Sequence, residues 1–255
     1  MAAKSPDQIS GLIAWWHAND VALSGSDVET WPDQSGNGFT LSKTGTVTFD
    51  ATDKGVVFPN STSSFLFHAS ALGFVGNPAM TIAARLGDQP NTVVSTDRWL
   101  HVGGNSGASG TARQLGVDFS TRYDDGAKGW SDNPIAAAGY NNFILTHPSG
   151  GGYTASELYF DGSLASVTGL SNGASTVNMT DDAFTLGASD GSSPNFAAQV
   201  TIKEIAVFDR VLTSQEITDL DLYLADETMG SLAPTGDFPA IGSAILSALQ
   251  PFDGR

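Results

Sequence analysis

One short segment of the chain, TRYDDGAKGWSDN (Thr121–Asn133), brings aromatic and acidic side chains together. Aromatic faces stack on sugar rings, and carboxylates bind sugar hydroxyls or a divalent cation. We therefore expect this segment to bind carbohydrate, either alone or together with Ca²⁺. The alternative is a solvated loop whose tryptophan packs down onto the body of the fold. The candidate binding residues are Tyr123, Asp124, Asp125, Trp130 and Asp132.

A second oxygen-rich segment, WPDQSGNG (Trp31–Gly38), offers a candidate cation ligand. Asp33 can accept a hydrogen bond from a backbone N–H two residues on, and Gly36 and Gly38 supply positive φ, which indicates a turn. The alternative is that Asp33 and neighbouring backbone carbonyls bind Ca²⁺, a cation that prefers oxygen ligands. Neither interpretation requires a cofactor, and Ca²⁺ is the single candidate metal.

The carboxylates do not follow the spacing expected of a glycosidase. Retaining hydrolysis needs two carboxyl groups about 5–5.5 Å apart, which alternate positions on one strand face can provide. Glu204 and Asp209 are five positions apart, so a regular strand places them on opposite faces. Glu157 and Asp161 are four positions apart, but Asp161 falls in a turn. We predict that the chain is not an enzyme, although a strand bulge would alter these spacings.

The balance of charge argues against nucleic-acid and membrane partners. The 255-residue chain has a formal net charge of −16, and its 11 Lys and Arg residues do not cluster along the sequence. Phosphate binding depends on clustered basic side chains, so we expect neither a nucleic acid nor an anionic membrane as a partner. The sequence has no cysteine, and no apolar run approaches the ~20 residues of a membrane-spanning helix.

Short apolar segments bounded by Gly, Pro, Asn and Asp predict a fold made mainly of strands. Asp161-Gly162 favours a type I′ hairpin with a return strand over Ser163–Val167. The strand expected over Val200–Phe208 does not alternate cleanly, which indicates a bulge near Lys203–Glu204 or burial of both faces. The other expected strands are Met80–Leu86, Trp99–Gly103, Gln114–Phe119, Asn142–Thr146, Glu157–Phe160 and Phe184–Leu186.

One helix is expected after these strands. Thr213-Ser-Gln-Glu216 has the sequence of a capping box, in which the threonine and glutamate side chains bond each other's backbone N–H. Apolar residues then recur at helical spacing, and the helix is expected to end near 225–227. Many short strands and one late helix indicate an all-β protein, an antiparallel β-sandwich.

The composition changes near Met229. We therefore divide the chain into a β-sandwich over residues 1–228 and a C-terminal arm or linker over residues 229–255. The arm has Gly and Pro without periodicity, followed by a short apolar segment, Ile241–Leu249. We expect the arm to dock on a neighbouring subunit. The alternative is a disordered or self-docked terminus.

Four sequence pieces follow one another along the chain: LIAWWHANDV, WPDQSGNG, NFILTHPSGGGYTASELYFDG and FTLGASDG with VTIKEIAVFDRVLTSQEI. Their order resembles the concanavalin A-like lectin/glucanase superfamily, in its laminin G-like branch. The resemblance spans residues 9–225 and implies a jelly-roll sandwich. It leaves function open, since that fold hosts lectins, glycosidases, adhesive modules and virion proteins.

Two functions from different classes remain open. The first is a structural or interaction protein of a bacteriophage virion, such as a capsid decoration, tail or appendage subunit. It would be made in the host cytoplasm and would contact other virion subunits or its own copies through residues 231–255. This expectation rests on a sandwich that begins near Met1, on the lack of an export signal and on the apolar arm. The alternative is an extracellular carbohydrate-binding module of a secreted or cell-surface protein. Surface glycans are partners compatible with both.

Overall fold

The computed structural model describes residues 3–87, 98–103, 115–118, 122–123, 128–130, 139–152, 155–170, 177–188, 197 and 199–226. The predicted arm over residues 229–255 lies outside these ranges. Among the described residues, no helix is long and apolar enough to cross a membrane.

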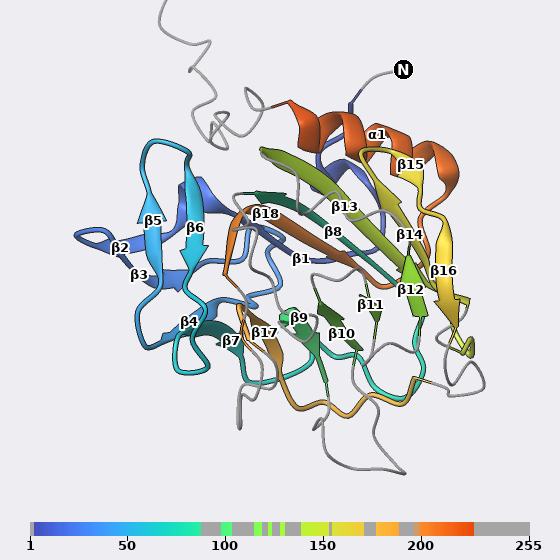
Figure 1. Ribbon diagram of the computed structural model, residues 1–255, viewed down its shortest axis with the longest axis horizontal. Helices are drawn as coiled ribbons and strands as arrows, with labels where there is room; N and C mark the ends of the chain where they lie inside the picture. Colours follow the sequence, from blue (N-terminus) through green and yellow to red (C-terminus); the bar gives the residue numbers. More distant parts are fainter. Residues whose placement is uncertain are drawn as a thin grey trace, which may run out of the picture.

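Antiparallel pairings arrange the strands in two series that lie face to face (Figure 1). The first layer contains, in spatial order, β15 (Ser163–Leu164), β14 (Glu157–Phe160), β13 (Tyr140–His147), β8 (Met80–Gly87), β18 (Val200–Phe208) and β1 (Leu12–His17). The second contains β16 (Val167–Leu170), β12 (Lys128–Trp130), β11 (Arg122–Tyr123), β10 (Leu115–Asp118), β9 (Arg98–Val102), β17 (Phe184–Leu186), β7 (Phe65–His68) and β4 (Leu41–Thr44).

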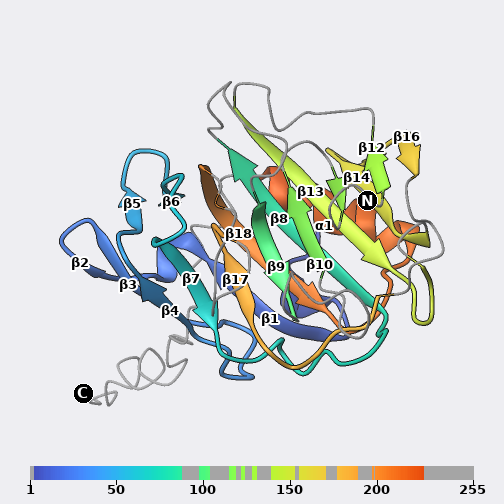
Figure 2. The same ribbon diagram turned by 60° about the horizontal axis from the view of Figure 1, so that its bottom comes forward.

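A smaller group of strands joins the two layers at one side of the molecule, where β5 pairs with both β3 and β6. β6 also pairs with the first residues of β18, and β3 pairs with β4. Figure 2 shows this group beside the two stacked layers. Its strands are β2 (Ala22–Ser24), β3 (Asp27–Trp31), β5 (Thr48–Asp50) and β6 (Gly55–Phe58).

The main core lies between the two layers. Trp16 of β1 stacks on Phe184 of β17 with ring centroids 5.0 Å apart. Trp99 of β9 meets Phe143 of β13 edge to face, also at 5.0 Å. All four side chains are almost completely buried, and each pair joins one layer to the other. Large aromatic contacts of this geometry add to the free energy gained by burial, so they fix the spacing of the layers. The prediction of an all-β antiparallel sandwich is confirmed.

Helix α1 (Ser214–Ala225) covers the outer face of the first layer. Its predicted capping box is present, since the hydroxyl of Thr213 accepts from the backbone N–H of Glu216 and the Glu216 carboxylate accepts from the backbone N–H of Thr213. The helix ends at Ala225, as predicted. Its apolar stripe, which includes Leu220, forms a second core with residues of β8, β13 and β18. Two short 3₁₀ helices, Pro6–Gln8 and Ala18–Asp20, flank β1.

The hairpin after β14 is partly as predicted. Asp161 and Gly162 have φ values of 44° and 73°, which is the type I′ turn expected of Asp-Gly. The return strand is shorter than the predicted Ser163–Val167, because β15 ends at Leu164. Ala165 then turns into the main core, and β16 joins β12 in the second layer. Burial of Ala165 and the crossing between layers end the hairpin early.

Candidate functional site

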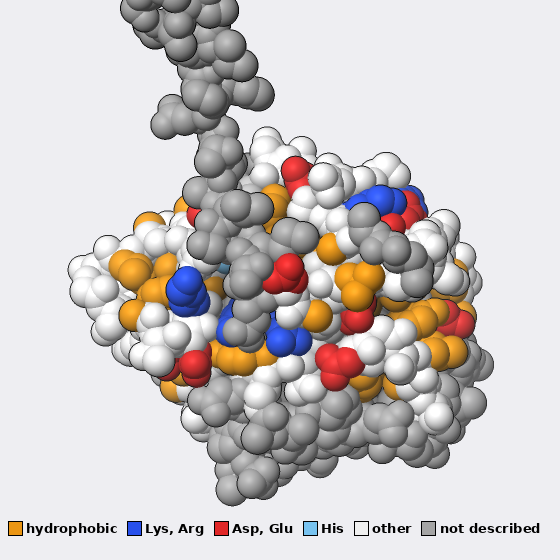
Figure 3. All heavy atoms as spheres, turned by 90° about the horizontal axis from the view of Figure 1, so that it is seen from above, with side chains coloured by type: hydrophobic (Ala, Val, Ile, Leu, Met, Phe, Trp, Pro, Cys, Tyr) orange, Lys and Arg blue, Asp and Glu red, His pale blue; other side chains and the backbone are white. Residues whose placement is uncertain are grey.

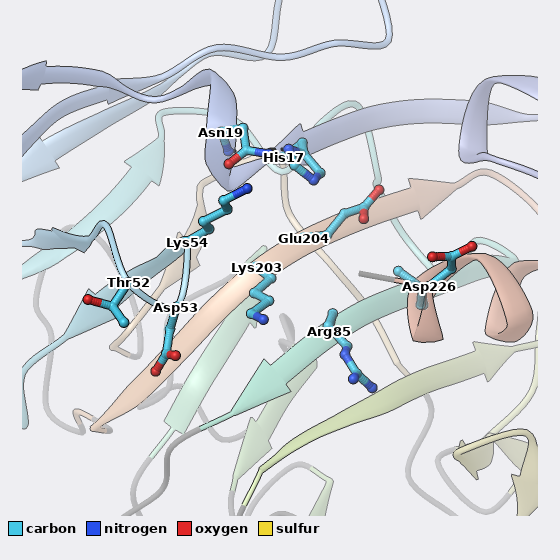
Figure 4. A pocket seen from close by; sticks show the side chains of 10 residues that line it. His17, Asn19, Thr52, Asp53, Lys54, Arg85, Lys203, Glu204 and Asp226 are labelled. Carbon is cyan, nitrogen blue, oxygen red and sulfur yellow. Dashed lines mark hydrogen bonds between the residues drawn. The ribbon is translucent and has the colours of Figure 1, made fainter. Parts of the chain in front are cut away.

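The predicted bulge in β18 decides which side chains reach the outer face of the first layer. The register between β18 and β8 shifts between Ile202 and Glu204. Ile202 and Ile205 both lie in the main core although they are three positions apart. The residue added by the bulge therefore places Lys203 and Glu204 together on the outer face, beside the end of α1 (Figure 4).

Strand pairing then assembles a polar row across this outer face. Glu204 of β18 is the register partner of His17 on β1 and of Arg85 on β8. Arg85 is in turn the partner of Asn142 on β13. Directly opposed residues in antiparallel strands have Cβ atoms about 4.5–5.5 Å apart, so the four side chains are immediate neighbours. Four strands far apart in the sequence thus contribute one residue each to a single row.

Glu204 is the buried carboxylate of the row, with an exposed fraction of 6%. Its Oε1 accepts a hydrogen bond of 2.6 Å from the indole Nε1–H of Trp15. The hydroxyl of Tyr223 on α1 also donates to this carboxylate. Burial raises the pKa of Glu204 to about 7, although both hydrogen bonds oppose that rise; the negative charge of Asp20 adds to it. Glu204 is therefore partly protonated near neutral pH.

A pocket of about 200 Å³ opens above this row. Figure 3 shows the molecule from the side of α1, where Lys and Arg side chains gather near the middle of the face. Figure 4 shows that the labelled lining side chains come from β1 and the 3₁₀ helix that follows it, the β5–β6 turn, β8, the β18 bulge and the end of α1. The lining residues are His17, Asn19, Thr52, Asp53, Lys54, Arg85, Lys203, Glu204, Leu224 and Asp226.

The pocket combines groups of both charges. Burial lowers the pKa of His17; the charge of Lys54 adds to this effect and that of Asp20 opposes it. His17 is therefore neutral near pH 7, and its Nδ1 accepts from the backbone N–H of Asn19 at 3.2 Å. Lys203 and Arg85 extend side by side from neighbouring strands (Figure 4). Their charged groups lie 3.7 and 5.9 Å from the centre of the Tyr140 ring.

One wall of the pocket is braced by hydrogen bonds to α1. Nη1 of Arg85 donates to Oδ1 of Asn142 at 2.8 Å. Nδ2 of Asn142 donates to both the backbone carbonyl and the carboxylate of Asp221, at 2.8 and 2.9 Å. The backbone N–H of Asn142 donates to Oδ1 of Asp161 at 2.8 Å. Charged partners strengthen such bonds, so the position of Arg85 is set by the helix and by the hairpin turn.

Asp33 lies away from this pocket, and the structure places it in a turn. Its Oδ1 accepts from the backbone N–H of Ser35 at 2.8 Å, which is the predicted Asx-type bond. The same oxygen accepts from the backbone N–H of Trp15 at 3.0 Å, and Oδ2 accepts from that of Phe39 at 3.0 Å. Within the described ranges, no group of three or more His, Asp or Glu side chains could hold a metal ion. A calcium role for Asp33 stays a prediction.

The predicted carbohydrate-binding segment is described only in part. Tyr123 belongs to β11 and Trp130 to β12, and these strands pair with each other, so their backbones form a ribbon. Asp124, Asp125 and Asp132 lie outside the described residues. The ribbon belongs to the second layer, whereas the pocket lies on the outer face of the first. The two candidate sites are therefore separate.

The sequence contains one usable signal for the pocket, which is the pair of charged residues inside the apolar strand VTIKEIAVF. That break predicts the bulge, but it does not show that Glu204 is buried beneath a pocket. Lys54 gave no signal, because a lysine before a glycine in a turn is an ordinary surface residue. In the structure Lys54 has a φ of 53° and its side chain extends toward Asn19 and His17 (Figure 4).

The sequence was also compared with known proteins. The model of the concanavalin A-like lectin/glucanases superfamily, in its third laminin G family, matches residues 50–218. No curated protein sequence matches the chain.

Solved structures match with low sequence identity. Domain 4 of the extracellular arabinanase AbnA from Geobacillus stearothermophilus, in complex with arabinotriose, is 15% identical with a TM-score of 0.54; the match covers 82% of this chain and 98% of that one. Trypanosoma rangeli sialidase with the inhibitor DANA is 17% identical with a TM-score of 0.54; the match covers 84% of this chain and 33% of the sialidase. The binding domain of botulinum neurotoxin DC in complex with SialylT is 12% identical with a TM-score of 0.52; the match covers 86% of this chain and 52% of the toxin domain. This chain thus spans a third of the sialidase and about half of the toxin domain.

Proposed function

The chain belongs to the concanavalin A-like lectin/glucanases superfamily, and on that premise we propose that it is a non-catalytic domain that binds carbohydrate. The observation that carries the proposal is the chemistry of the pocket. Leu224 is the one apolar side chain among its described lining residues. Sugar hydroxyls both donate and accept hydrogen bonds, and a wall of mixed donors and acceptors is their natural complement.

The size of the pocket supports a small polar ligand. Pockets for drug-sized molecules occupy roughly 300–1,000 Å³ and are mostly apolar. This pocket is smaller, at about 200 Å³, and polar. It suits the end of a glycan or a single sugar ring rather than a flat apolar molecule. The complex of the similar arabinanase domain with arabinotriose, a domain that this chain matches over nearly its full length, agrees with such a use of the fold.

The position of Glu204 supports binding rather than hydrolysis. Two side chains, Trp15 and Tyr223, already donate to its carboxylate and hold it against the helix. Its register neighbours in the row are a histidine, an arginine and an asparagine, so no second carboxylate stands beside it on the strand face where glycosidases of this spacing would need one. The other carboxylates of the pocket, Asp53 and Asp226, come from the β5–β6 turn and the end of α1. The resemblance to the sialidase covers a third of that enzyme and brings no activity to this chain.

A glycan array followed by calorimetric titration of the best ligand tests the proposal. Thr52→Trp should fill the pocket and abolish binding, because Thr52 is exposed on the β5–β6 turn at the pocket wall. Thr62→Trp is the matched control, since Thr62 is an exposed turn residue outside the pocket and should keep full affinity. A wild-type chain that binds no glycan would overturn the proposed function.

The same ligand separates the two candidate sites. Trp130→Ala should leave binding unchanged if the pocket is the site. If Trp130→Ala abolishes binding and Thr52→Trp does not, carbohydrate binding is retained as the function but moves to the β11–β12 ribbon. Tyr123, Asp124, Asp125 and Asp132 would then be the next positions to change.

A second proposal concerns assembly, and it rests on the sequence alone. We propose that the domain serves as a subunit of a virion, with the apolar segment Ile241–Leu249 docking on a neighbouring subunit. Size-exclusion chromatography with light scattering tests it. The full chain should form a trimer or larger complex, and deletion of residues 231–255 should release monomers. A strict monomer would favour the alternative, a module of a secreted or cell-surface protein.

A further inference from the structure

Basic side chains are scarce in this chain, yet three of its 11 Lys and Arg residues line one pocket. Lys54 comes from the β5–β6 turn, Arg85 from β8 and Lys203 from the β18 bulge. Figure 4 shows Lys54 on one side of the pocket and the other two side by side across from it. With a net charge of −16, the protein as a whole repels anions, so a local group of cations marks a place where an anion is accepted.

We propose that this pocket recognises an acidic sugar, through a carboxylate on the sugar ring. The inference rests on the proposed carbohydrate-binding function and names its ligand class. Lys54 and Lys203 supply ammonium groups to the carboxylate. Arg85 adds a positive charge to the floor of the pocket between β8 and β13. His17, which is neutral near pH 7, and Asn19 face the same space and meet ring hydroxyls.

The acidic residues of the pocket argue for a ligand with a single negative charge. Asp53 and Asp226 also line it, and Glu204 lies in its floor. The three cations therefore share this space with carboxylates that repel a second negative charge on a ligand, and this balance favours a ligand group with one charge. A phosphate monoester carries nearly two charges at pH 7 and fits that balance less well than a carboxylate.

Matched sugar pairs isolate the carboxylate. Calorimetric titration at low ionic strength compares glucuronate with glucose and galacturonate with galactose, which differ at one carbon. One or both of the acids should bind about tenfold more tightly than the neutral partner. A tenfold difference in affinity corresponds to about 1.4 kcal/mol. Its affinity should fall as salt is added, because exposed lysine charges are screened. Inorganic phosphate should bind more weakly than the preferred acid.

A charge-matched pair of variants places the effect in the pocket. Lys54 is exposed, so Lys54→Gln should leave the melting temperature unchanged and weaken binding of the preferred acid about tenfold. Lys4→Gln removes the same charge from a lysine outside the pocket that pairs with Asp219, and should keep the affinity. Equal losses in both variants would show a general effect of net charge and overturn the proposed site.

The outcomes separate this inference from the function it rests on. If sugars bind but neither acid exceeds its neutral partner, the inference fails and carbohydrate binding is retained. If inorganic phosphate binds as tightly as the acids, the pocket is a simple anion site and the inference fails again. If neither the glycan array nor the matched pairs show binding, the proposed function fails, and the acidic-sugar inference with it.

Discussion

Two carboxylates lie on either side of Trp15 and are held in opposite ways. The backbone N–H of Trp15 donates to Asp33, and its indole N–H donates to Glu204. Asp33 accepts from three backbone N–H groups and from the hydroxyl of Ser35, so both of its oxygens are fully used. Glu204 accepts from two side chains, Trp15 and Tyr223, and lies at the floor of the pocket.

The difference between the two lies in what each carboxylate holds in place. The 33–37 segment bonds along the free edge of β1: the N–H of Gln34 donates to the carbonyl of Trp15 at 2.7 Å, and the hydroxyl of Ser35 donates to that of Ile13 at 2.9 Å. An unpaired strand edge invites pairing with other chains, and the turn fixed by Asp33 closes this one. Glu204 closes no edge. It joins β18 to β1 and α1 beneath a pocket, where its charge can respond to pH.

Asp33→Ala should have the largest effect on stability. The substitution removes four hydrogen bonds to a charged acceptor and leaves three backbone N–H groups without it, so we expect a loss of about 4 kcal/mol in the free energy of unfolding. The edge of β1 would open, and the variant should also be more prone to self-association. Urea unfolding and light scattering measure the two effects.

Asp33→Asn is the control for this prediction. The amide keeps one acceptor oxygen but loses the second, so it should restore about half of the lost stability. A loss below about 1 kcal/mol in Asp33→Ala would show that the turn holds without its carboxylate. Added Ca²⁺ tests the predicted cation site: a rise in Tm on adding Ca²⁺ that Asp33→Asn abolishes would support it, and an unchanged Tm would leave Asp33 as a turn residue.

Glu204→Gln should have the next largest effect, and its sign depends on pH. The pKa of Glu204 rises from an ordinary value of 4.5 to about 7 in the folded chain, so the folded state binds the proton more tightly. The stability that this proton contributes is full below pH 4.5, falls as the pH rises toward 7 and is gone above it. The loss across that range is about 3 kcal/mol, and the glutamine variant should not show it.

His147 makes a comparison between variants necessary. Burial lowers its pKa to about 4, so its contribution to stability is present above pH 6.5 and is lost as the pH falls toward 4. The two groups act in opposite directions over the same range. The measured quantity is therefore the difference in unfolding free energy between wild type and Glu204→Gln at each pH from 4 to 8. A difference that does not change with pH would contradict the burial argument.

The sequence predicts those features whose hydrogen bonds are local. Asp33 with Ser35, Asp161 with Gly162 and Thr213 with Glu216 are two, one and three positions apart, and each turn or cap is found where its residue types require it. Such pairs meet because backbone geometry between neighbours allows few alternatives.

The pocket could not be predicted in the same way. Its side chains come from five segments between residues 17 and 226, and only strand register brings them together. The bulge changes which face Glu204 occupies, and alternation alone cannot give its exact position. Even the indole N–H of Trp15 finds its partner 189 positions along the chain. The sequence can show that a strand has two faces, but it cannot show which distant residues lie together on one of them.

Trp15→Phe should have the smallest effect and should act on one carboxylate only. Asp33 keeps its hydrogen bond from residue 15, because the donor there is the backbone N–H and not the side chain. Glu204 loses the indole hydrogen bond, which lowers its pKa in the wild type, so the pKa of Glu204 should rise from its wild-type value of about 7. The stability at pH 6 should fall by about 1 kcal/mol. Carbon-detected NMR of the glutamate carboxyls gives the pKa directly, and an unchanged value would show that the indole hydrogen bond does not contribute to the pKa of Glu204.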